Sequence, residues 1–204
     1  ELPGAHLRLT DEEGNVVEEW ISTKEPHVIK ELVVGKSYTL TETKPADGYV
    51  TAESITFTVE NTAEVQKHIM EDDVTKVLIS KTDISGNELP GAKLTILDAE
   101  GNVVECWTST EEAHYIEKLP IGEYTLREES APNGYLVAED VKFTVEDTGE
   151  IQKVVMVDEA KPPVQTDSPK TGDSSPIAVW AGIGMLAMGL FGVTLAMRKK
   201  NRDR

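Results

Sequence analysis

The pentapeptide Glu1-Leu2-Pro3-Gly4-Ala5 recurs as Glu88-Leu89-Pro90-Gly91-Ala92, and this duplication decides how the chain is organised. Residues 14–18 likewise recur as residues 101–105, and the sequence Phe-Thr-Val-Glu at 57–60 recurs at 143–146. Self-similarity at a nearly fixed offset indicates tandem copies of one structural unit. The sequence therefore predicts a first repeat at residues 1–73, which lacks its opening strand, and a complete second repeat at residues 74–159.

Each repeat has the pattern of a small all-β unit. In the second repeat, short runs rich in Val, Ile, Thr and Tyr alternate with turn residues, for example at 85–87, 100–102 and 131–134. We expect strands at residues 77–82, 92–98, 103–109, 113–118, 122–129, 140–146 and 151–158. Seven short strands in about 85 residues are typical of an antiparallel β-sandwich. The fold class is therefore predicted to be all-β, with two tandem sandwiches.

The chain is acidic, with 37 Asp and Glu against 20 Lys and Arg and a formal net charge of −17. A surface of this sign repels phosphate backbones, so we expect no nucleic-acid partner. The single cysteine, Cys106, excludes an intramolecular disulfide, and its place in the repeat suggests that it faces solvent. The segment Asp98-x-Glu100-Gly101-Asn102 lacks the later glutamate of a calcium loop, so we expect a polar turn. No cofactor or metal is predicted.

Two aromatic pairs occupy equivalent positions in the repeats. Trp20 corresponds to Trp107, and His27 corresponds to His114. Because each histidine belongs to a separate repeat, the two cannot form one metal site. We expect the histidines to pack within the sandwich and the tryptophans to be core or edge anchors.

The C-terminal part of the chain follows a different pattern. Residues 160–173 are a proline-rich spacer. Residues 177–197 contain no charged side chain and are long enough to cross a bilayer as a helix, so we place a membrane-spanning segment at 174–197. The basic tail at 198–204 predicts a cytoplasmic C-terminus, which leaves the repeats on the outer side.

The pentapeptide Ser168-Pro169-Lys170-Thr171-Gly172 precedes this apolar segment. Together with the apolar span and the basic tail, it resembles the Leu-Pro-x-Thr-Gly sorting signal of surface proteins in Gram-positive bacteria. Ser168 replaces the usual leucine, which leaves the class of sortase open. The resemblance implies that a sortase cleaves after Thr171 and joins it to a peptidoglycan amine, so the protein resides in the membrane only before processing. A plain single-pass anchor is the alternative.

Strand periodicity places charged side chains on apolar faces. Glu128 shares one face of its strand with Tyr124 and Leu126, because side chains alternate along a strand. Glu42 has the equivalent position in the first repeat, and Lys81 shares a face with two apolar residues of the opening strand. An unpaired buried charge is costly, so these inward side chains require partners.

Residues 124–135, Tyr-Thr-Leu-Arg-Glu-Glu-Ser-Ala-Pro-Asn-Gly-Tyr, resemble the glutamate-box motif of collagen-adhesin B-type and SpaA-like pilin repeats. The Lys-Thr-Asp sequence at 81–83 and the Gly-Ala turn at 91–92 are similar to the same family. The resemblance covers residues 1 to about 159 and implies a prealbumin-like fold. It also implies a self-catalysed isopeptide bond between the first and last strands.

Carried over to this chain, the resemblance makes Lys81 the nucleophile, Glu128 the proton shuttle and Asp158 the acceptor. The chemistry is physically sound, because burial favours the neutral amine and the protonated carboxyl group that must react. Glu159 is a rival acceptor, since both faces of the last strand are almost equally apolar. A non-covalent Lys–Glu–Asp cluster is the alternative to the bond.

In the first repeat, the same resemblance makes Glu42 the shuttle and Asp72 the acceptor. The partner lysine is expected upstream of Glu1.

Three functional hypotheses follow. The leading one is a structural stalk on the cell wall, with sortase and peptidoglycan as partners and a host ligand bound through upstream regions. The second is an adhesin whose repeats bind host matrix or carbohydrate directly. The third is a pilus subunit, for which Lys161 is the nearest candidate for a polymerising lysine. A turnover enzyme is not expected, because the only implied chemistry is one self-modification.

Overall fold

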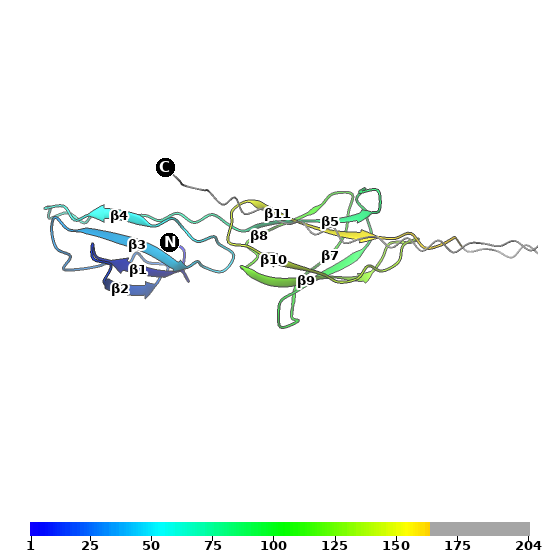
Figure 1. Cartoon of the computed structure of the whole chain (residues 1–204), viewed down its shortest axis with the longest axis horizontal. Helices are drawn as coiled ribbons and strands as arrows, with labels where there is room; N and C mark the ends of the chain where they lie inside the picture. The colour runs from blue at the N-terminus through cyan, green and yellow to red at the C-terminus, as the bar shows by residue number, and fades with distance from the viewer. Residues whose placement is uncertain (164–204) are drawn as a thin grey trace, which may run out of the picture. The chain divides into compact units, whose positions relative to one another are not determined.

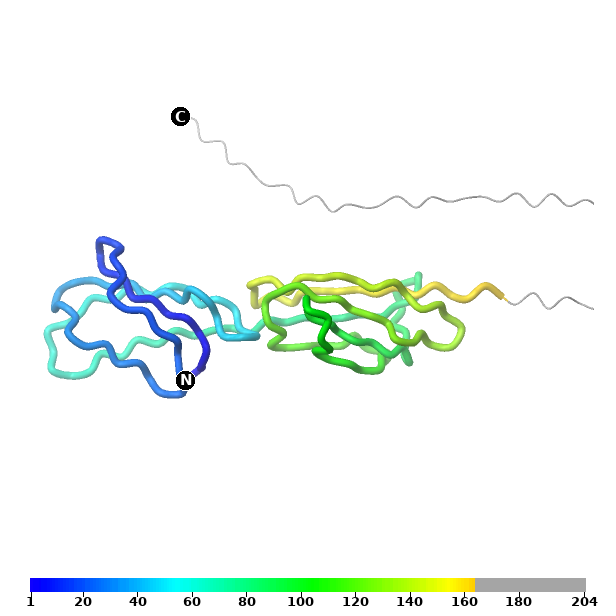
Figure 2. The backbone as a smooth tube through the Cα atoms, turned by 90° about the horizontal axis from the view of Figure 1, so that it is seen from below, coloured from blue at the N-terminus to red at the C-terminus, as the bar shows by residue number. Residues whose placement is uncertain are grey.

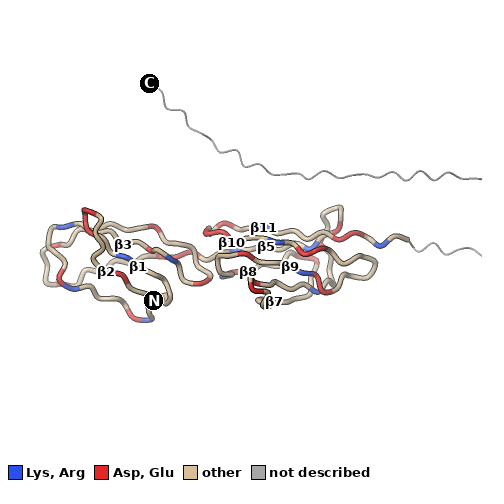
Figure 3. The backbone as a smooth tube through the Cα atoms, turned by 60° about the horizontal axis from the view of Figure 1, so that its bottom comes forward, with Lys and Arg blue, Asp and Glu red and all other residues tan. Residues whose placement is uncertain are grey.

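A computed structural model describes residues 1–163, which form one compact unit. Most of the predicted spacer, the sorting motif, the predicted membrane-spanning segment and the basic tail lie outside the described residues. Within residues 1–163, no helix is long and apolar enough to cross a membrane. Acidic side chains are distributed over both repeats rather than gathered at one place (Figure 3).

The first repeat contains a single four-stranded sheet (Figure 1). Its strands are β1 (His6–Thr10), β2 (Val16–Ile21), β3 (Ser37–Lys44) and β4 (Ile55–Thr58). They pair in the order β2-β1-β3-β4, and every pair is antiparallel.

The second repeat contains two sheets that enclose a core. One sheet has the order β10-β9-β6-β7 and the other has the order β11-β5-β8. The strands are β5 (Lys76–Asp83), β6 (Lys93–Leu97), β7 (Val103–Thr108), β8 (His114–Glu117), β9 (Gly122–Ser130), β10 (Val141–Val145) and β11 (Ile151–Asp158). The seven strands expected from the sequence are thus confirmed to within one residue at each end, because period-two apolar runs between turn residues define strands well.

The predicted antiparallel pairing holds for every strand pair of residues 1–163 except one. The first and last strands of the second repeat, β5 and β11, pair in parallel, with Lys81 opposite Met156. Figure 2 shows these two strands side by side. A local sequence pattern reports which residues share a face but not which distant strands pair, so the orientation of this pair was not visible in it. Because β5 and β11 run in the same direction, the chain enters the second repeat at one end of this sheet and leaves it at the opposite end.

The first repeat also differs from its prediction as a sandwich that lacks only one strand. Residues 27–30 and 65–72, which correspond to β8 and β11, form no strand. The reason lies in the second repeat, where β5 is the central strand of its sheet and pairs with both β8 and β11. Residues 1–73 contain no counterpart of β5, so among the described residues these two segments have no central strand with which to pair.

Candidate functional site

Three strands of the second repeat bring three charged side chains together in its core. Lys81 on β5 and Asp158 on β11 lie in one sheet, and Glu128 on β9 lies in the facing sheet. Each follows two inward apolar residues of its own strand, as the alternation of side chains requires. Lys81, Glu128 and Asp158 are only 2%, 4% and 0% exposed. The predicted nucleophile, shuttle and acceptor therefore share one buried site.

The lysine contacts both carboxyl groups. Lys81 Nζ donates a hydrogen bond to Asp158 Oδ1 and lies 3.1 Å from Glu128 Oε1. The other oxygen of the glutamate, Oε2, accepts a hydrogen bond from the backbone N–H of Ala138 at 2.7 Å. This backbone contact fixes the orientation of the carboxyl group and leaves Oε1 directed at the amine.

Two oxygen atoms of the site have no hydrogen-bond partner among the described residues. They are Glu128 Oε1 and Asp158 Oδ2, and both are fully shielded from solvent. Buried polar atoms without partners are rare in folded proteins and call for an explanation. The arrangement is the one that an amine needs in order to attack a carboxyl carbon while a second carboxyl group takes up a proton.

The structure shows which of the two candidate acceptors, Asp158 and Glu159, lies next to Lys81. Asp158 faces the core and contacts the lysine, whereas Glu159 is exposed. Side chains of consecutive strand residues point to opposite faces, so only one of the two can reach Lys81.

The first repeat contains the carboxyl half of an equivalent site. Glu42 is 4% exposed, and its Oε2 accepts a hydrogen bond from the N–H of Ala52 at 2.6 Å, as its counterpart does in the second repeat. Burial raises the pKa of Glu42, and the nearby charge of Asp72 raises it further. Burial also raises the pKa of Asp72. Within residues 1–163, neither carboxyl group forms an ion pair.

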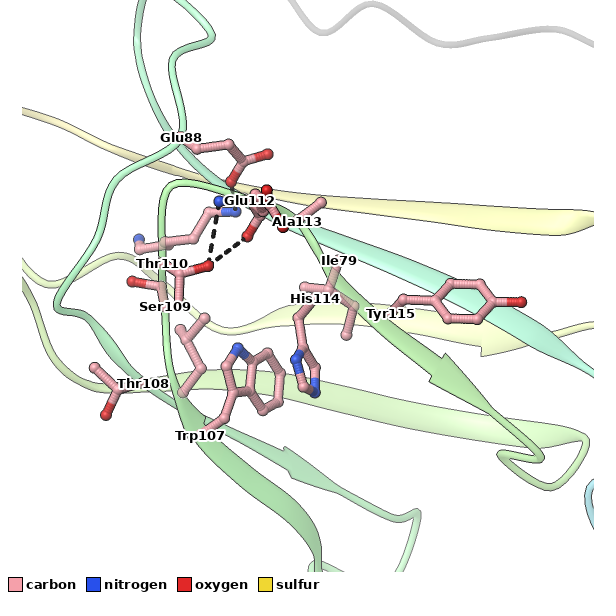
Figure 4. A pocket seen from close by; sticks show the side chains of 12 residues that line it. Ile79, Glu88, Trp107, Thr108, Ser109, Thr110, Glu112, Ala113, His114 and Tyr115 are labelled. Carbon is pink, nitrogen blue, oxygen red and sulfur yellow. Dashed lines mark hydrogen bonds between the residues drawn. The ribbon is translucent and has the colours of Figure 1, made fainter.

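A pocket beside this site is lined by Trp107 and His114, whose mutual contact was not predicted from the sequence (Figure 4). The rings of Trp107 and His114 stack with centroids 4.3 Å apart at an interplanar angle of 15°. The Nε2 atom of His114 lies 2.7 Å from Glu105 Oε1. Because Trp107 belongs to β7 and His114 to β8, this contact joins the two sheets, and Lys81 also lines the pocket.

The first repeat has the same cluster. Trp20 and His27 stack at 4.3 Å and 15°, and His27 Nε2 lies 2.8 Å from Glu18 Oε1. The identical Glu-x-Trp-x₆-His spacing in both repeats was the signal that could have revealed it. The histidines do not pack inside the sandwich as expected. They lie at its edge, where the side chain of His114 remains 30% exposed.

Two smaller expectations are confirmed. Cys106 is exposed. The Asp98 segment is a polar turn, in which the aspartate accepts hydrogen bonds from the backbone N–H groups of Glu100 and Asn102 at 3.0 and 2.8 Å. The residues of the predicted sorting motif, 168–172, lie outside the part of the chain that the structure describes.

Comparisons with known proteins identify a family. A family model for the SpaA prealbumin-like fold domain matches residues 1–73 and residues 75–160. Comparison with curated proteins gave no match.

Several solved structures are similar to this chain. The Bacillus anthracis TIE protein is 30% identical with a TM-score of 0.49, and the match covers 78% of this chain but only 31% of that one. The shaft pilin SpaA from Lactobacillus rhamnosus GG is 13% identical with a TM-score of 0.36, and the match covers 79% and 90% of the two chains. A streptococcal ancillary pilin is 19% identical with a TM-score of 0.36, with 79% and 59% covered.

Proposed function

The chain belongs to the family of SpaA prealbumin-like fold domains, and on that premise we propose that it is a structural stalk segment of a bacterial surface protein. In this proposal the second repeat locks itself with an isopeptide bond between Lys81 and Asp158. The protein is then attached to peptidoglycan through Thr171, and the repeats carry upstream regions away from the cell wall.

One observation carries the proposal. The amine of Lys81 lies between two carboxyl groups, Asp158 and Glu128, and all three side chains are almost fully buried. A buried ion pair gains little net stability, because removing charges from water costs about as much as their attraction returns. A cluster that instead condenses to a neutral amide removes this cost and holds the first and last strands together.

The reaction balances without a cofactor. The neutral amine of Lys81 attacks Cγ of protonated Asp158, and the Nζ–Cγ bond forms. A proton passes from the nitrogen through Glu128 to the departing hydroxyl group, and one water leaves. Fixed positions in the folded core replace external activation, because they keep the reacting groups in contact.

The direct experiment is the intact mass of the compact unit, residues 1–163. The parent is expected to weigh one water less than its sequence predicts, and a peptide map should join Lys81 to Asp158. The Lys81→Met and Glu128→Gln variants should have their full calculated masses. A folded parent at full mass would refute the bond.

Two further variants sharpen the assignment of the acceptor. Asp158→Asn loses ammonia instead of water, so its crosslinked product should have the same mass as the crosslinked parent. Glu159→Ala serves as the matched control at the adjacent exposed position and should retain the loss of one water. If only the Glu159→Ala variant had its full calculated mass, Glu159 rather than Asp158 would be the acceptor.

A further inference from the structure

The strand that carries Lys81 loses one of its two neighbours just before the lysine. On one side, β5 remains paired with β11 as far as Asp83. On the other side it pairs with β8 only over residues 76–79, so the last partnered residue there is Ile79. Lys81 therefore lies beyond the end of β8. The backbone groups that it directs to this side need other partners, because buried backbone groups without hydrogen bonds are costly.

The chain that returns after β5 supplies the first of these partners. Thr82 forms an antiparallel bridge with Glu88. The backbone N–H of Leu89 donates a hydrogen bond to the carbonyl of Lys81 at 2.7 Å. In a regular antiparallel pair the carbonyl of Leu89 would accept the N–H of Lys81 in return, but here it accepts the hydroxyl of Ser109 at 2.6 Å. The N–H of the lysine therefore requires a different acceptor.

The side chain of Glu88 provides that acceptor. Its Oε2 atom accepts a hydrogen bond from the backbone N–H of Lys81 at 3.1 Å. Glu88 is partly buried and lies at the wall of the pocket that Lys81 also lines (Figure 4). Its carboxylate binds the backbone of the lysine, whereas the amine of the lysine pairs with Glu128 and Asp158. Glu88 is therefore placed to support the nucleophile without contacting the reacting atoms.

We propose that Glu88 is a positioning residue for the crosslink, because its hydrogen bond fixes the backbone from which the side chain of Lys81 reaches Asp158. This inference rests on the function proposed above. The lysine side chain is a flexible four-carbon stem, so the place of its amine depends on where its backbone is held. The amine must contact Asp158 and also lie 3.1 Å from Glu128 Oε1. A displacement of about 1 Å from such a geometry can lower a rate by roughly 10²-fold.

The role of Glu88 requires an acceptor atom and not a negative charge. It neither gives nor takes a proton in the reaction, so the covalent step remains the one written above. Glu88→Gln retains a side-chain oxygen of the same reach, because a glutamine amide oxygen is also an acceptor. Glu88→Ala leaves the N–H of Lys81 without this partner.

The test measures how fast newly made chains of residues 1–163 form the bond. Chains are pulse-labelled during cell-free synthesis and quenched in denaturant at intervals, and intact mass gives the fraction that has lost one water. Protease resistance of parallel samples reports folding. Glu88→Ala should form the bond at least about tenfold more slowly than the parent, with protease resistance acquired at the parental rate. Glu88→Gln should recover the rate to within about threefold of the parent.

Glu112 provides the matched control for charge. It carries another carboxyl group of the same pocket, and its hydrogen bonds with Thr110 are made by its backbone. Glu112→Ala should therefore react at the parental rate. The positioning role would be overturned by a fast Glu88→Ala, by a Glu88→Gln as slow as Glu88→Ala, or by a Glu112→Ala that is equally slow. Slow bond formation that only follows slow folding would overturn it as well.

Amide exchange separates a failure of this inference from a failure of the proposed function. In a Glu128→Gln background, which should not crosslink, the amide hydrogen of Lys81 should exchange faster in Glu88→Ala than in Glu88→Gln. If the parent loses one water and Glu88→Ala does so at the same rate, the positioning role is wrong and the proposed function stands. If no chain loses water although exchange responds to Glu88, the isopeptide bond is wrong, and the positioning role fails with it.

Discussion

Lys81 and Asp158 are in contact although 77 positions separate them in the sequence. The parallel register of β5 and β11 produces this contact, because it sets Lys81 opposite Met156 and places Asp158 two residues further along the same face. A covalent link here closes a loop that contains nearly the whole second repeat. By analogy with a disulfide, closure of a loop of this length contributes about 4 kcal/mol to the free energy of unfolding.

Replacing Asp158 should lower the free energy of unfolding far more than replacing the adjacent Glu159. Asp158→Ala removes the crosslink and leaves the amine of Lys81 buried beside a single carboxyl group, which should lower the free energy of unfolding by more than about 3 kcal/mol. Glu159→Ala, at an exposed position, should change it by less than about 0.5 kcal/mol. Urea denaturation of both variants measures the difference. Equal stabilities would show that the buried site does not stabilise the fold.

The Trp–His contact between the two sheets should contribute to stability. Trp107→Ala removes the stacked ring and its packing against the core, and we expect a loss of about 2 kcal/mol. This is below the 3–5 kcal/mol typical of fully buried tryptophan, because Trp107 is only partly buried. Thermal unfolding of Trp107→Ala against the exposed control Thr108→Ala provides the measurement. If Trp107→Ala were as stable as Thr108→Ala, the Trp107–His114 stack would not contribute to the stability of the repeat.

Ser109 closes the turn before β6 through two buried hydrogen bonds. Its hydroxyl donates to the carbonyl of Leu89 at 2.6 Å and accepts from the N–H of Ala92 at 2.9 Å. Ser109→Ala leaves both backbone groups without these partners, so the free energy of unfolding should fall by about 2 kcal/mol. Chemical denaturation tests this, with Thr110→Ala as a neighbouring exposed control. A loss no larger than that of the control would contradict it.

The stability of the first repeat should depend on pH through Glu42 and Asp72. Folding raises both pKa values above their ordinary values of 4.5 and 3.8, so the folded state favours the protonated acids. The stabilisation is therefore fully present below those ordinary values and is lost as the pH rises through the folded pKa values. Glu42→Gln mimics the neutral acid and should be more stable than the parent at neutral pH.

This advantage of Glu42→Gln should shrink as the pH falls toward 4.5, the ordinary pKa of the glutamate. Hydrogen exchange of β3 in the parent and the variant across this range measures it. A constant difference in stability between the two proteins at every pH would show that ionisation of Glu42 does not change the free energy of unfolding.

Sortase processing predicts one cleavage site. Incubation of the full chain with a sortase and an amine nucleophile should cut between Thr171 and Gly172 and leave the amine on Thr171. Because the enzyme reads the pentapeptide, Ser168→Leu should increase the rate, and Thr171→Ala should abolish it. Mass spectrometry of the released fragments identifies the bond. Unchanged chain with Ser168→Leu would favour a plain membrane anchor.

Much of the architecture was visible in the sequence. The recurrence of Glu1–Ala5 at Glu88–Ala92 revealed the tandem repeats, and period-two alternation located the seven strands of the second repeat to within one residue at each end. The same alternation identified Lys81 and Glu128 as inward charges, because it is a local property of each strand. The stacking of Trp107 on His114 was not predicted, because it joins strands of different sheets and local alternation does not report such contacts.

The sequence by itself therefore determined the duplication within residues 1–160, through direct recurrence of motifs. It also determined the strands of the second repeat and the faces of their side chains, because these depend on residues a few positions apart. Only the tertiary structure decided that β5 and β11 pair in parallel, that Asp158 rather than Glu159 meets Lys81, and that the first repeat forms a single sheet. The physical reason is common to all three. Each depends on which distant strands exchange hydrogen bonds, and the central position of β5 sets this pairing.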